Sequence, residues 1–251
     1  MLKPAAAALA LALAITACST SNEVATPEIS PSAEETSAPQ EQDVAADLWV
    51  SAVSVPDGGV TIEAQLITSV AGFERVTSGT GYVDTSAGAG DINWTDELGV
   101  TREIRTDTGH YLQVEETWFE IERENALPTT IVFEPFRGLD QAANIRIDGE
   151  EDVRGAATTQ LTATLNPNDA GIEMGFSEEE RSIVKDATDA SLTATIWVDG
   201  DGRIVRVLRE YSATSSEQDP IEATSLYLFD EFGVERPIDV AATAEAIPAP
   251  A

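Results

Sequence analysis

The sequence contains one cysteine and one histidine, and each scarcity excludes a class of function. Cys18 has no second cysteine to pair with, so no disulfide within the chain can hold the fold. A zinc site of His and Cys ligands cannot be built from one of each, and we expect no metal and no cofactor. His110 lies beside a predicted turn, where we expect a surface position, and no Gly-x-Ser-x-Gly motif accompanies it. Because no nucleophile, base and orienting group occur together, we expect that the protein is not an enzyme.

Positive charge is also scarce. The chain has 14 Lys and Arg residues, of which two are Lys, against 45 Asp and Glu residues, and its formal net charge is -31. Such a surface repels nucleic acid and anionic lipid headgroups. We therefore predict no nucleic-acid partner, and we interpret the acidity first as a source of solubility.

Long apolar runs are absent after the N-terminus. The run Ala5–Ile15 consists only of Ala, Leu and Ile, and it follows the single charge of Lys3. Eleven such residues match the apolar region of a signal peptide. A membrane-spanning helix would need roughly 20 residues. We predict a signal peptide over residues 1–17, whose removal changes the net charge from -31 to -31 - 1 = -32.

The segment Ile15-Thr16-Ala17-Cys18 resembles the lipobox of bacterial lipoproteins. This resemblance implies cleavage before Cys18 and a diacylglycerol thioether on its sulfur, with further acylation such as palmitate. The alternative is an ordinary secretion signal that happens to contain a cysteine. Two or more acyl chains make a stable anchor. We therefore expect a lipid-anchored protein on the extracytoplasmic face of the cell membrane, with Cys18 as the anchor.

The remaining chain divides by composition. Residues 18–42 are rich in Ser, Thr, Pro and Glu and are predicted to be a disordered acidic linker, with a reach of about 25–30 Å. Residues 43–245 are predicted to form one domain, and residues 246–251 a loose tail. Within the domain, the spacing of Val44, Leu48 and other apolar residues predicts a helix over residues 43–55. A strand over residues 48–55 is the alternative.

From Val60 onward the apolar residues alternate with polar ones, which predicts strands. A break over residues 128–143 contains a short predicted helix at Pro135–Leu139. Another helix is predicted over Ser177–Asp189, where Ser177 and Glu180 have the spacing of a capping box. The predicted strands are 60–66, 79–84, 90–94, 100–105, 110–114, 117–122, 145–147, 158–165, 192–198, 203–211 and 221–229. They indicate a meandering antiparallel sheet.

Two further features of the sequence bear on function. Asp199-Gly200-Asp201-Gly202 superficially resembles a calcium loop, but Arg203 and Ile204 stand where a ligand and a glycine are needed. We predict a hairpin turn there. The four tryptophans either pack in the core or line a lipid-binding surface. They are Trp49, Trp94, Trp118 and Trp197.

The order of these features resembles the LolA/LppX-like (LprG-like) lipoproteins. The residues that carry the resemblance are the lipobox and the segments 79–84, 90–94, 111–118, 197–203 and 232–233. The resemblance covers most of residues 44–240. It implies an α+β fold: a strongly curved antiparallel half-barrel of about eleven strands, with a few helices covering its concave face. It also implies an apolar cavity that holds acyl chains. Relatives carry lipids or lipoproteins between membranes, and one branch senses envelope stress.

Our prediction is a membrane-anchored binding protein that takes up a lipid or a lipid-linked molecule in that cavity. The apolar strand faces expected to line it carry Ile62, Leu66, Ile104, Phe119, Ile121, Leu161, Leu165, Ile196 and Leu208. Small residues on these faces, Ala64, Ala163 and Ala194, would leave room inside. The alternative is an envelope sensor or accessory module with a filled core, which binds a protein partner instead of a lipid.

Overall fold

The chain separates into two compact units, residues 1–36 and 37–251, and only the second is described. The lipobox, Cys18 and most of the predicted linker lie outside the described residues. Among the residues that are described, no helix is both long enough and apolar enough to cross a membrane. The computed structural model describes residues 39–53, 58–84, 87–106, 109–121, 136, 138–169, 174, 176, 178–240, 243 and 245–248.

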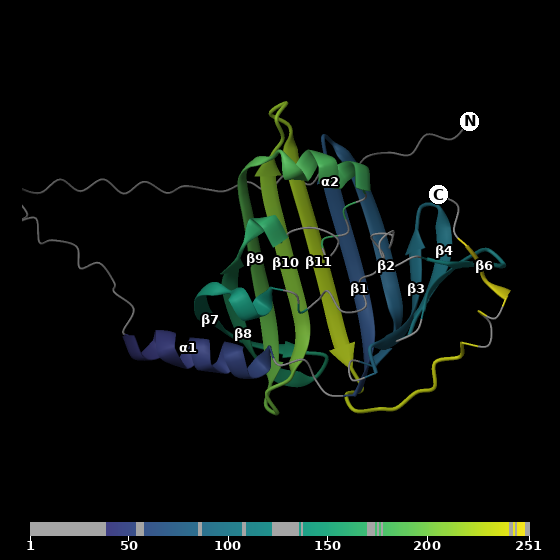
Figure 1. Cartoon of the computed structure of the whole chain (residues 1–251). Helices are drawn as coiled ribbons and strands as arrows, with labels where there is room; N and C mark the ends of the chain where they lie inside the picture. The colour runs from purple at the N-terminus through teal and green to yellow at the C-terminus, as the bar shows by residue number, and fades with distance from the viewer. Residues whose placement is uncertain are drawn as a thin grey trace, which may run out of the picture. The chain divides into compact units, whose positions relative to one another are not determined.

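The described residues of the second unit form twelve strands and two α-helices (Figure 1). The helices are α1 (Pro39–Ala52) and α2 (Glu178–Lys185), with short 3-10 turns η3 (Leu139–Gln141) and η4 (Pro167–Asp169). The strands are β1 (Gly59–Val70), β2 (Phe73–Asp84), β3 (Ala89–Asp96), β4 (Gly99–Arg105), β5 (His110–Val114), β6 (Thr117–Glu120), β7 (Ala143–Val153), β8 (Ala156–Leu165), β9 (Thr188–Asp199), β10 (Ile204–Thr214), β11 (Pro220–Asp230) and β12 (Ile247–Pro248).

All twelve strands belong to one sheet, in the order β12-β6-β5-β4-β3-β2-β1-β11-β10-β9-β8-β7. Two antiparallel meanders, β1–β6 and β7–β11, join where β1 pairs with β11. The sheet is not closed on itself, because β12 and β7 are its two edges. The predicted antiparallel meander is confirmed, and the strand count exceeds the prediction by the two-residue β12, which pairs parallel to β6. That strand lies within the segment predicted as a loose tail.

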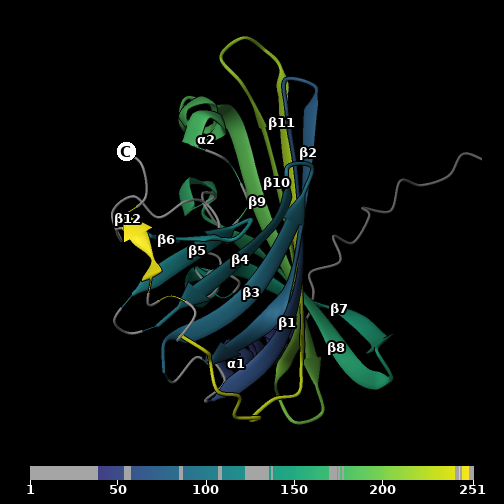
Figure 2. The same ribbon diagram turned by 90° about the vertical axis from the view of Figure 1, so that its right-hand side faces the viewer.

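The sheet is bent, and its two faces differ (Figure 2). The β3–β6 end curves toward the side that carries α2, whereas the β7–β8 hairpin flares toward the opposite side. We call the side of α2 the inner face and the other the outer face. Cross-strand partners share a face, so the register assigns each residue. The inner face carries one apolar cluster, whose largest fully buried members are Trp49, Trp94, Tyr227, Phe176, Ile62, Ile92, Leu139, Leu161 and Met174.

Helix α1 differs from the prediction in its start and in its buried side. It begins at Pro39, within the predicted linker. The predicted apolar side included Val44, but Val44 is 58% exposed, whereas Ala45 and Trp49 are each 1% exposed. The indole Nε1 of Trp49 donates a hydrogen bond to the carbonyl of Leu139, at 2.7 Å. The helix is rotated so that the large indole is buried with its polar atom paired, and the buried positions are therefore Ala45 and Trp49 instead of Val44 and Leu48.

Beyond β11 the chain forms what we call the strap, residues 231–240, which crosses the outer face of β1–β3. The Tyr82 hydroxyl donates to the carbonyl of Val234 at 2.8 Å, and the amide of Arg236 donates to the same hydroxyl oxygen at 3.2 Å. The amide of Gly233 donates to the carbonyl of Gly59 at 2.8 Å. A Cβ at Gly59 would lie 1.9 Å from the Tyr82 hydroxyl oxygen, so the strap can dock only because this position lacks a side chain.

Candidate functional site

The inner face brings together seven of the nine residues predicted to line a cavity. Five of them are members of the inner cluster: Ile62, Leu66, Leu161, Leu165 and Ile196. Phe119 and Ile121 lie on the same face. Phe119 is the cross-strand partner of Leu112, Leu112 is the partner of Glu103, and Glu103 is the partner of Ile92, which belongs to the cluster. Phe119 is half-buried and Ile121 is buried.

Ile104 is on the outer face, and its predicted place in the cavity is wrong. Its cross-strand partners are Asp91 and Tyr111, and it is 0% exposed. The sequence predicts Ile104 on the inward face of β4. Glu103 faces inward instead, because two buried donors on neighbouring strands bind its carboxylate.

Leu208 is also on the outer face, where it packs against Val153, Trp197 and Val205. The cause is a β-bulge between Ile204 and Arg206. A bulge adds one residue to a strand, so every side chain beyond it changes face. Ile204 therefore points inward before the bulge and Val207 after it, and both belong to the inner cluster.

One row of inner-face residues combines three small side chains with an arginine. Across β8, β9, β10 and β11 the register aligns Ala163, Ala194, Arg209 and Ser225. The rows on either side carry bulky residues, Leu161 and Ile196 in one and Leu165 and Leu192 in the other. All of these side chains are buried. The two alanines therefore lie side by side between bulkier rows, next to the buried side chain of Arg209.

Arg209 places a cation within this row. Its side chain is fully buried, with Ala194 opposite it on β9 and Ser225 opposite it on β11. A charge in such a position is tolerated only with polar partners. The hydroxyl of Ser225 also contacts Sδ of Met174 at 3.7 Å. No apolar periodicity could have predicted a charged residue at an inner position.

Further along the inner face, Glu103 joins a buried network with His110 and Trp94. The indole Nε1 of Trp94 donates to Oε2 of Glu103 at 2.9 Å, and Nε2 of His110 lies 2.8 Å from Oε1. His110 is 5% exposed, so the predicted surface position is wrong. The indole of Trp94 lies over Gly79, where a Cβ would be 2.3 Å from the ring. Glycine at this position makes room for the indole, and the indole in turn holds the carboxylate.

Helix α2 contacts the opposite end of the inner face. The carboxylate of Glu180 accepts hydrogen bonds from Arg75 at 2.5 Å and from the hydroxyl of Thr68 at 3.3 Å. Arg75 and Thr68 are cross-strand partners on β2 and β1. Val184 of α2 packs against the inner cluster. The predicted cap residue Ser177 lies outside the described residues.

Two of the predicted tryptophans, Trp49 and Trp94, belong to the inner cluster, and two lie on the outer face. Trp118 is buried beside Arg102, whose guanidinium is 5.8 Å from the ring centre. Trp197 is buried under Arg206, at 4.1 Å.

The turn at Asp199–Gly202 joins β9 to β10 as predicted. Among the described residues, no group of three His, Cys, Asp or Glu side chains is placed to hold a metal ion.

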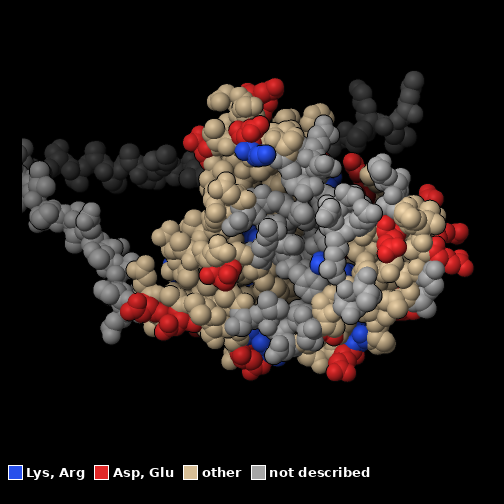
Figure 3. All heavy atoms as spheres, viewed as in Figure 1, with Lys and Arg blue, Asp and Glu red and all other residues tan. Residues whose placement is uncertain are grey.

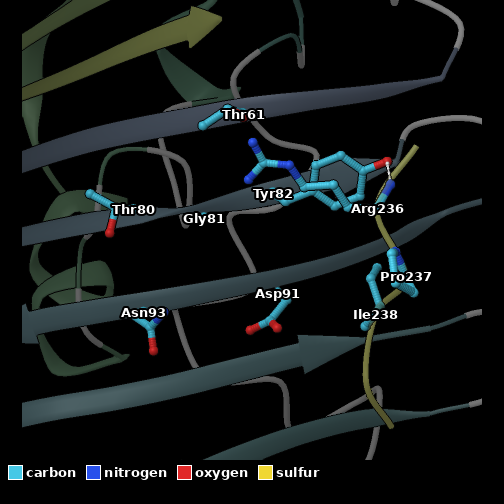
Figure 4. Close-up of a pocket in the computed structure, with 9 residues that line it drawn as sticks. All are labelled: Thr61, Thr80, Gly81, Tyr82, Asp91, Asn93, Arg236, Pro237 and Ile238. Carbon is cyan, nitrogen blue, oxygen red and sulfur yellow. Dashed lines mark hydrogen bonds between the residues drawn. The ribbon is translucent and has the colours of Figure 1, made fainter. Parts of the chain in front are cut away.

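The outer face has a polar pocket of about 340 Å³ beside the strap (Figure 4). Arg236 lies over the ring of Tyr82 on one side, and Asp91 and Asn93 line the other. The charged groups here are paired within the protein: Asp91 accepts two hydrogen bonds from Arg102, and Arg236 binds Glu231. The hydrogen bonds to Asp91 raise the pKa of the Arg102 guanidinium above its ordinary value. These charged groups are therefore satisfied within the protein, and Tyr82, whose hydroxyl binds the strap at Val234, forms one wall of the pocket.

Comparison with known proteins identifies the fold. No protein-family model matches the chain, and no characterised protein sequence matches it. The structure of the lipoprotein LppX of Mycobacterium tuberculosis is similar, with a TM-score of 0.53, 14% identity and coverage of 80% of this chain and 100% of LppX. LprF from Mycobacterium bovis gives a TM-score of 0.49 at 13% identity, covering 80% of this chain and 97% of LprF. The chain therefore has the LppX-like fold that its sequence predicted.

Proposed function

Given the LppX-like fold, we propose that the protein binds a lipid or a lipid-linked molecule, as a carrier or chaperone and not as an enzyme. The acyl chain lies in an apolar cavity between the inner face of the sheet and the helices α1 and α2. The lipidated Cys18 tethers the protein to the extracytoplasmic face of the cell membrane. The cavity is lined by the seven inner-face residues predicted from the sequence.

The observation that carries this proposal is the continuous apolar cluster of the inner face, together with two adjacent alanines within it. Ala163 and Ala194 are neighbours between rows of leucine, isoleucine and tyrosine, so side-chain volume on the sheet is smallest there, and we place the acyl chain over these two residues. Each buried methylene contributes about 0.8 kcal/mol. An acyl chain of ordinary length therefore supplies ample affinity without a specific polar site.

The acidic surface is compatible with this role. Acidic side chains stand at the margins of the view in Figure 3, notably along α1 and at the tips of the strands. A protein with a net charge of -31 does not adhere to anionic headgroups, which favours a tethered domain that exchanges its cargo over one that lies on the membrane.

The test is native mass spectrometry of the full chain, purified in mild detergent from a cell that makes its own lipids. We expect a non-covalent adduct that extracts into organic solvent and matches a lipid mass, while the covalent anchor stays on the protein. Ala194→Leu, which adds side-chain volume at the two adjacent alanines, should lose the adduct. The matched control Thr195→Val changes the next residue, on the outer face, and should keep it.

A mass without adduct, repeated after incubation with envelope lipids, would exclude a lipid carrier. Retention of the adduct by a folded Ala194→Leu protein would place the lipid elsewhere. A normal unfolding transition establishes that each variant is folded.

A second candidate, an envelope protein-interaction module, is favoured by one observation. Phe73 is 82% exposed and Leu98 is 91% exposed. They stand at the β1–β2 and β3–β4 turns, which lie at the same end of an antiparallel meander. Large apolar side chains at such tips suit a protein partner. Phe73→Ser with Leu98→Ser should leave any lipid adduct intact and abolish a cross-link to that partner.

A further inference from the structure

The two ends of the inner face are covered by different helices. At one end α1 buries Trp49 in the inner cluster, and the indole is hydrogen-bonded to the carbonyl of Leu139. The short helix α2 lies at the other end (Figure 1). Of its two apolar side chains, Val184 packs against the cluster, whereas Ile183 is 37% exposed. The inner face is therefore covered less completely at the α2 end.

A hollow of about 280 Å³ opens at this end, and we call it the α2 hollow. Its lining comes from α2, from the β1–β2 turn and from the β10–β11 turn. Ser182 and Ser216 line it and are exposed, whereas Val70 lines it and is a buried member of the inner cluster. The α2 hollow thus connects the solvent with the apolar side chains of the inner face.

Hydrogen bonds fix the walls of the α2 hollow. Glu180 accepts from Arg75 at 2.5 Å and from Thr68 at 3.3 Å, which holds α2 over β1 and β2. In the β10–β11 turn, the hydroxyl oxygen of Ser215 accepts from the amides of Glu217 and Asp219, at 3.2 and 3.0 Å. Because both walls are held within the protein, the hollow is a feature of the folded domain.

The register connects the α2 hollow to the two alanines of the inner face. Val70, Thr68 and Leu66 share the inner side of β1, and the row of Leu66 continues through β11 and β10 to Ala194 and Ala163. Four residues of a strand span roughly 13 Å. A chain that enters beside Val70 therefore crosses one intervening row before it reaches the alanines.

We propose that the α2 hollow is the mouth through which an acyl chain enters and leaves the inner face, an inference that rests on the proposed lipid-binding function. Phe73 is the cross-strand partner of Val70 and is 82% exposed, so its ring stands at the rim and offers the first apolar contact. Asp186, Glu217 and Asp219 also line the hollow. Their charges repel an anionic head group, so the mouth favours a lipid with a neutral one.

The experiment measures how fast a lipid reaches the inner face. The probe is a pyrene-labelled diacylglycerol, which is neutral, and the protein is the full chain in mild detergent. Energy transfer from tryptophan to pyrene reports uptake, since Trp49 and Trp94 belong to the inner cluster. Stopped-flow fluorescence gives the rate of uptake, and native mass spectrometry gives the amount bound at equilibrium.

Two serine substitutions close the mouth. Ser182→Phe with Ser216→Phe fills the α2 hollow and should slow uptake roughly tenfold. The amount bound at equilibrium should stay unchanged, because entry and exit use the same mouth and slow together. The matched control, Ser78→Phe with Ser212→Phe, adds the same two rings to exposed positions on the outer face and should keep the original rate.

A second pair of variants tests the rim. Phe73→Ser removes the exposed ring beside Val70 and should slow uptake by a smaller factor, again without changing the amount bound. Leu98→Ser removes an equally exposed side chain from the β3–β4 turn, which does not line the α2 hollow, and should leave the rate unchanged.

The outcomes separate the mouth from the function. If the unmodified chain takes up no probe and carries no lipid, the proposed function and the mouth are both refuted. If it takes up the probe and the filled variant does so at the same rate, only the mouth is overturned. Loss of bound probe at equilibrium in the filled variant also overturns it, because the hollow would then be the binding site and not the route. A normal unfolding transition establishes that each variant is folded.

Discussion

The two faces of this sheet are built from the same alternating strands, yet they bury their side chains in different ways. The inner face collects its apolar residues into one cluster that extends from α1 to β3. The outer face carries threonines, ion pairs and separate apolar residues, each covered by a different piece of chain. Tyr82 is held beneath the strap, and Trp197 is buried under Arg206. We therefore expect mutations on the inner face to change the stability of the whole domain, and mutations on the outer face to have smaller, local effects.

The inner face also holds charge in a different way. Glu103 and Arg209 are fully buried there. Outer charges such as those of Arg154 and Glu63 remain partly exposed and bind each other at 2.5 Å. Exposed pairs contribute little, about 0–1 kcal/mol, whereas a buried group without its partner is costly. We therefore predict that replacing a charged side chain lowers stability most on the inner face, where its neighbours are apolar.

The largest expected difference is between two leucines. Leu161→Ala removes a fully buried side chain from the inner cluster and should lower the free energy of unfolding by about 2–5 kcal/mol. Leu208→Ala, on the outer face and only half-buried, should cost less than half as much. Urea unfolding followed by circular dichroism measures both. Equal costs would mean that the two faces are packed alike.

The next effect concerns the buried network. Glu103→Leu leaves the buried donors of Trp94 and His110 without their acceptor and should cost about 2–3 kcal/mol. Glu116→Leu, in the exposed β5–β6 turn, is the control and should change stability by less than about 0.5 kcal/mol. Equilibrium unfolding measures both variants. An unchanged midpoint for Glu103→Leu would show that the network does not stabilise the fold.

A smaller and local effect is expected at the strap. Tyr82→Phe removes the hydrogen bond to Val234 and should cost about 1 kcal/mol. Hydrogen exchange should accelerate in residues 233–240 and not on the inner strands. Tyr111→Phe, on the same outer face, is the control. Uniform acceleration over the whole sheet would contradict the view that outer covers act locally.

The smallest effect appears only at alkaline pH. Burial raises the pKa of the Tyr211 hydroxyl above its ordinary value of 10.0. The unfolded chain therefore ionises first, so the stability contributed by Tyr211 is complete below about pH 10 and is lost as the pH rises toward the folded pKa. Tyr211→Phe should remove this loss. Urea midpoints compared at about pH 9 and about pH 11 test it, and an unchanged pH slope in the variant would refute it.

The sequence by itself determined the elements that depend on near neighbours. Alternation predicted the strands of both meanders, and the paired Asp-Gly steps predicted the turn at Asp199–Gly202. The antiparallel order followed, because short strands joined by tight turns pair with their neighbours. The resemblance to the LppX-like fold rested on the same local patterns, and the structural similarity to LppX bears it out.

Only the tertiary structure decided which way several side chains point. The bulge at Ile204–Arg206 moved Leu208 to the outer face, and partners on β3 and β5 drew Glu103 inward. The rotation of α1 and the course of the strap depend on hydrogen bonds from Trp49 and Tyr82 to residues 90 and 152 positions away. A periodic pattern shows which side chains favour burial, but contacts between segments distant in sequence decide which of them face the core.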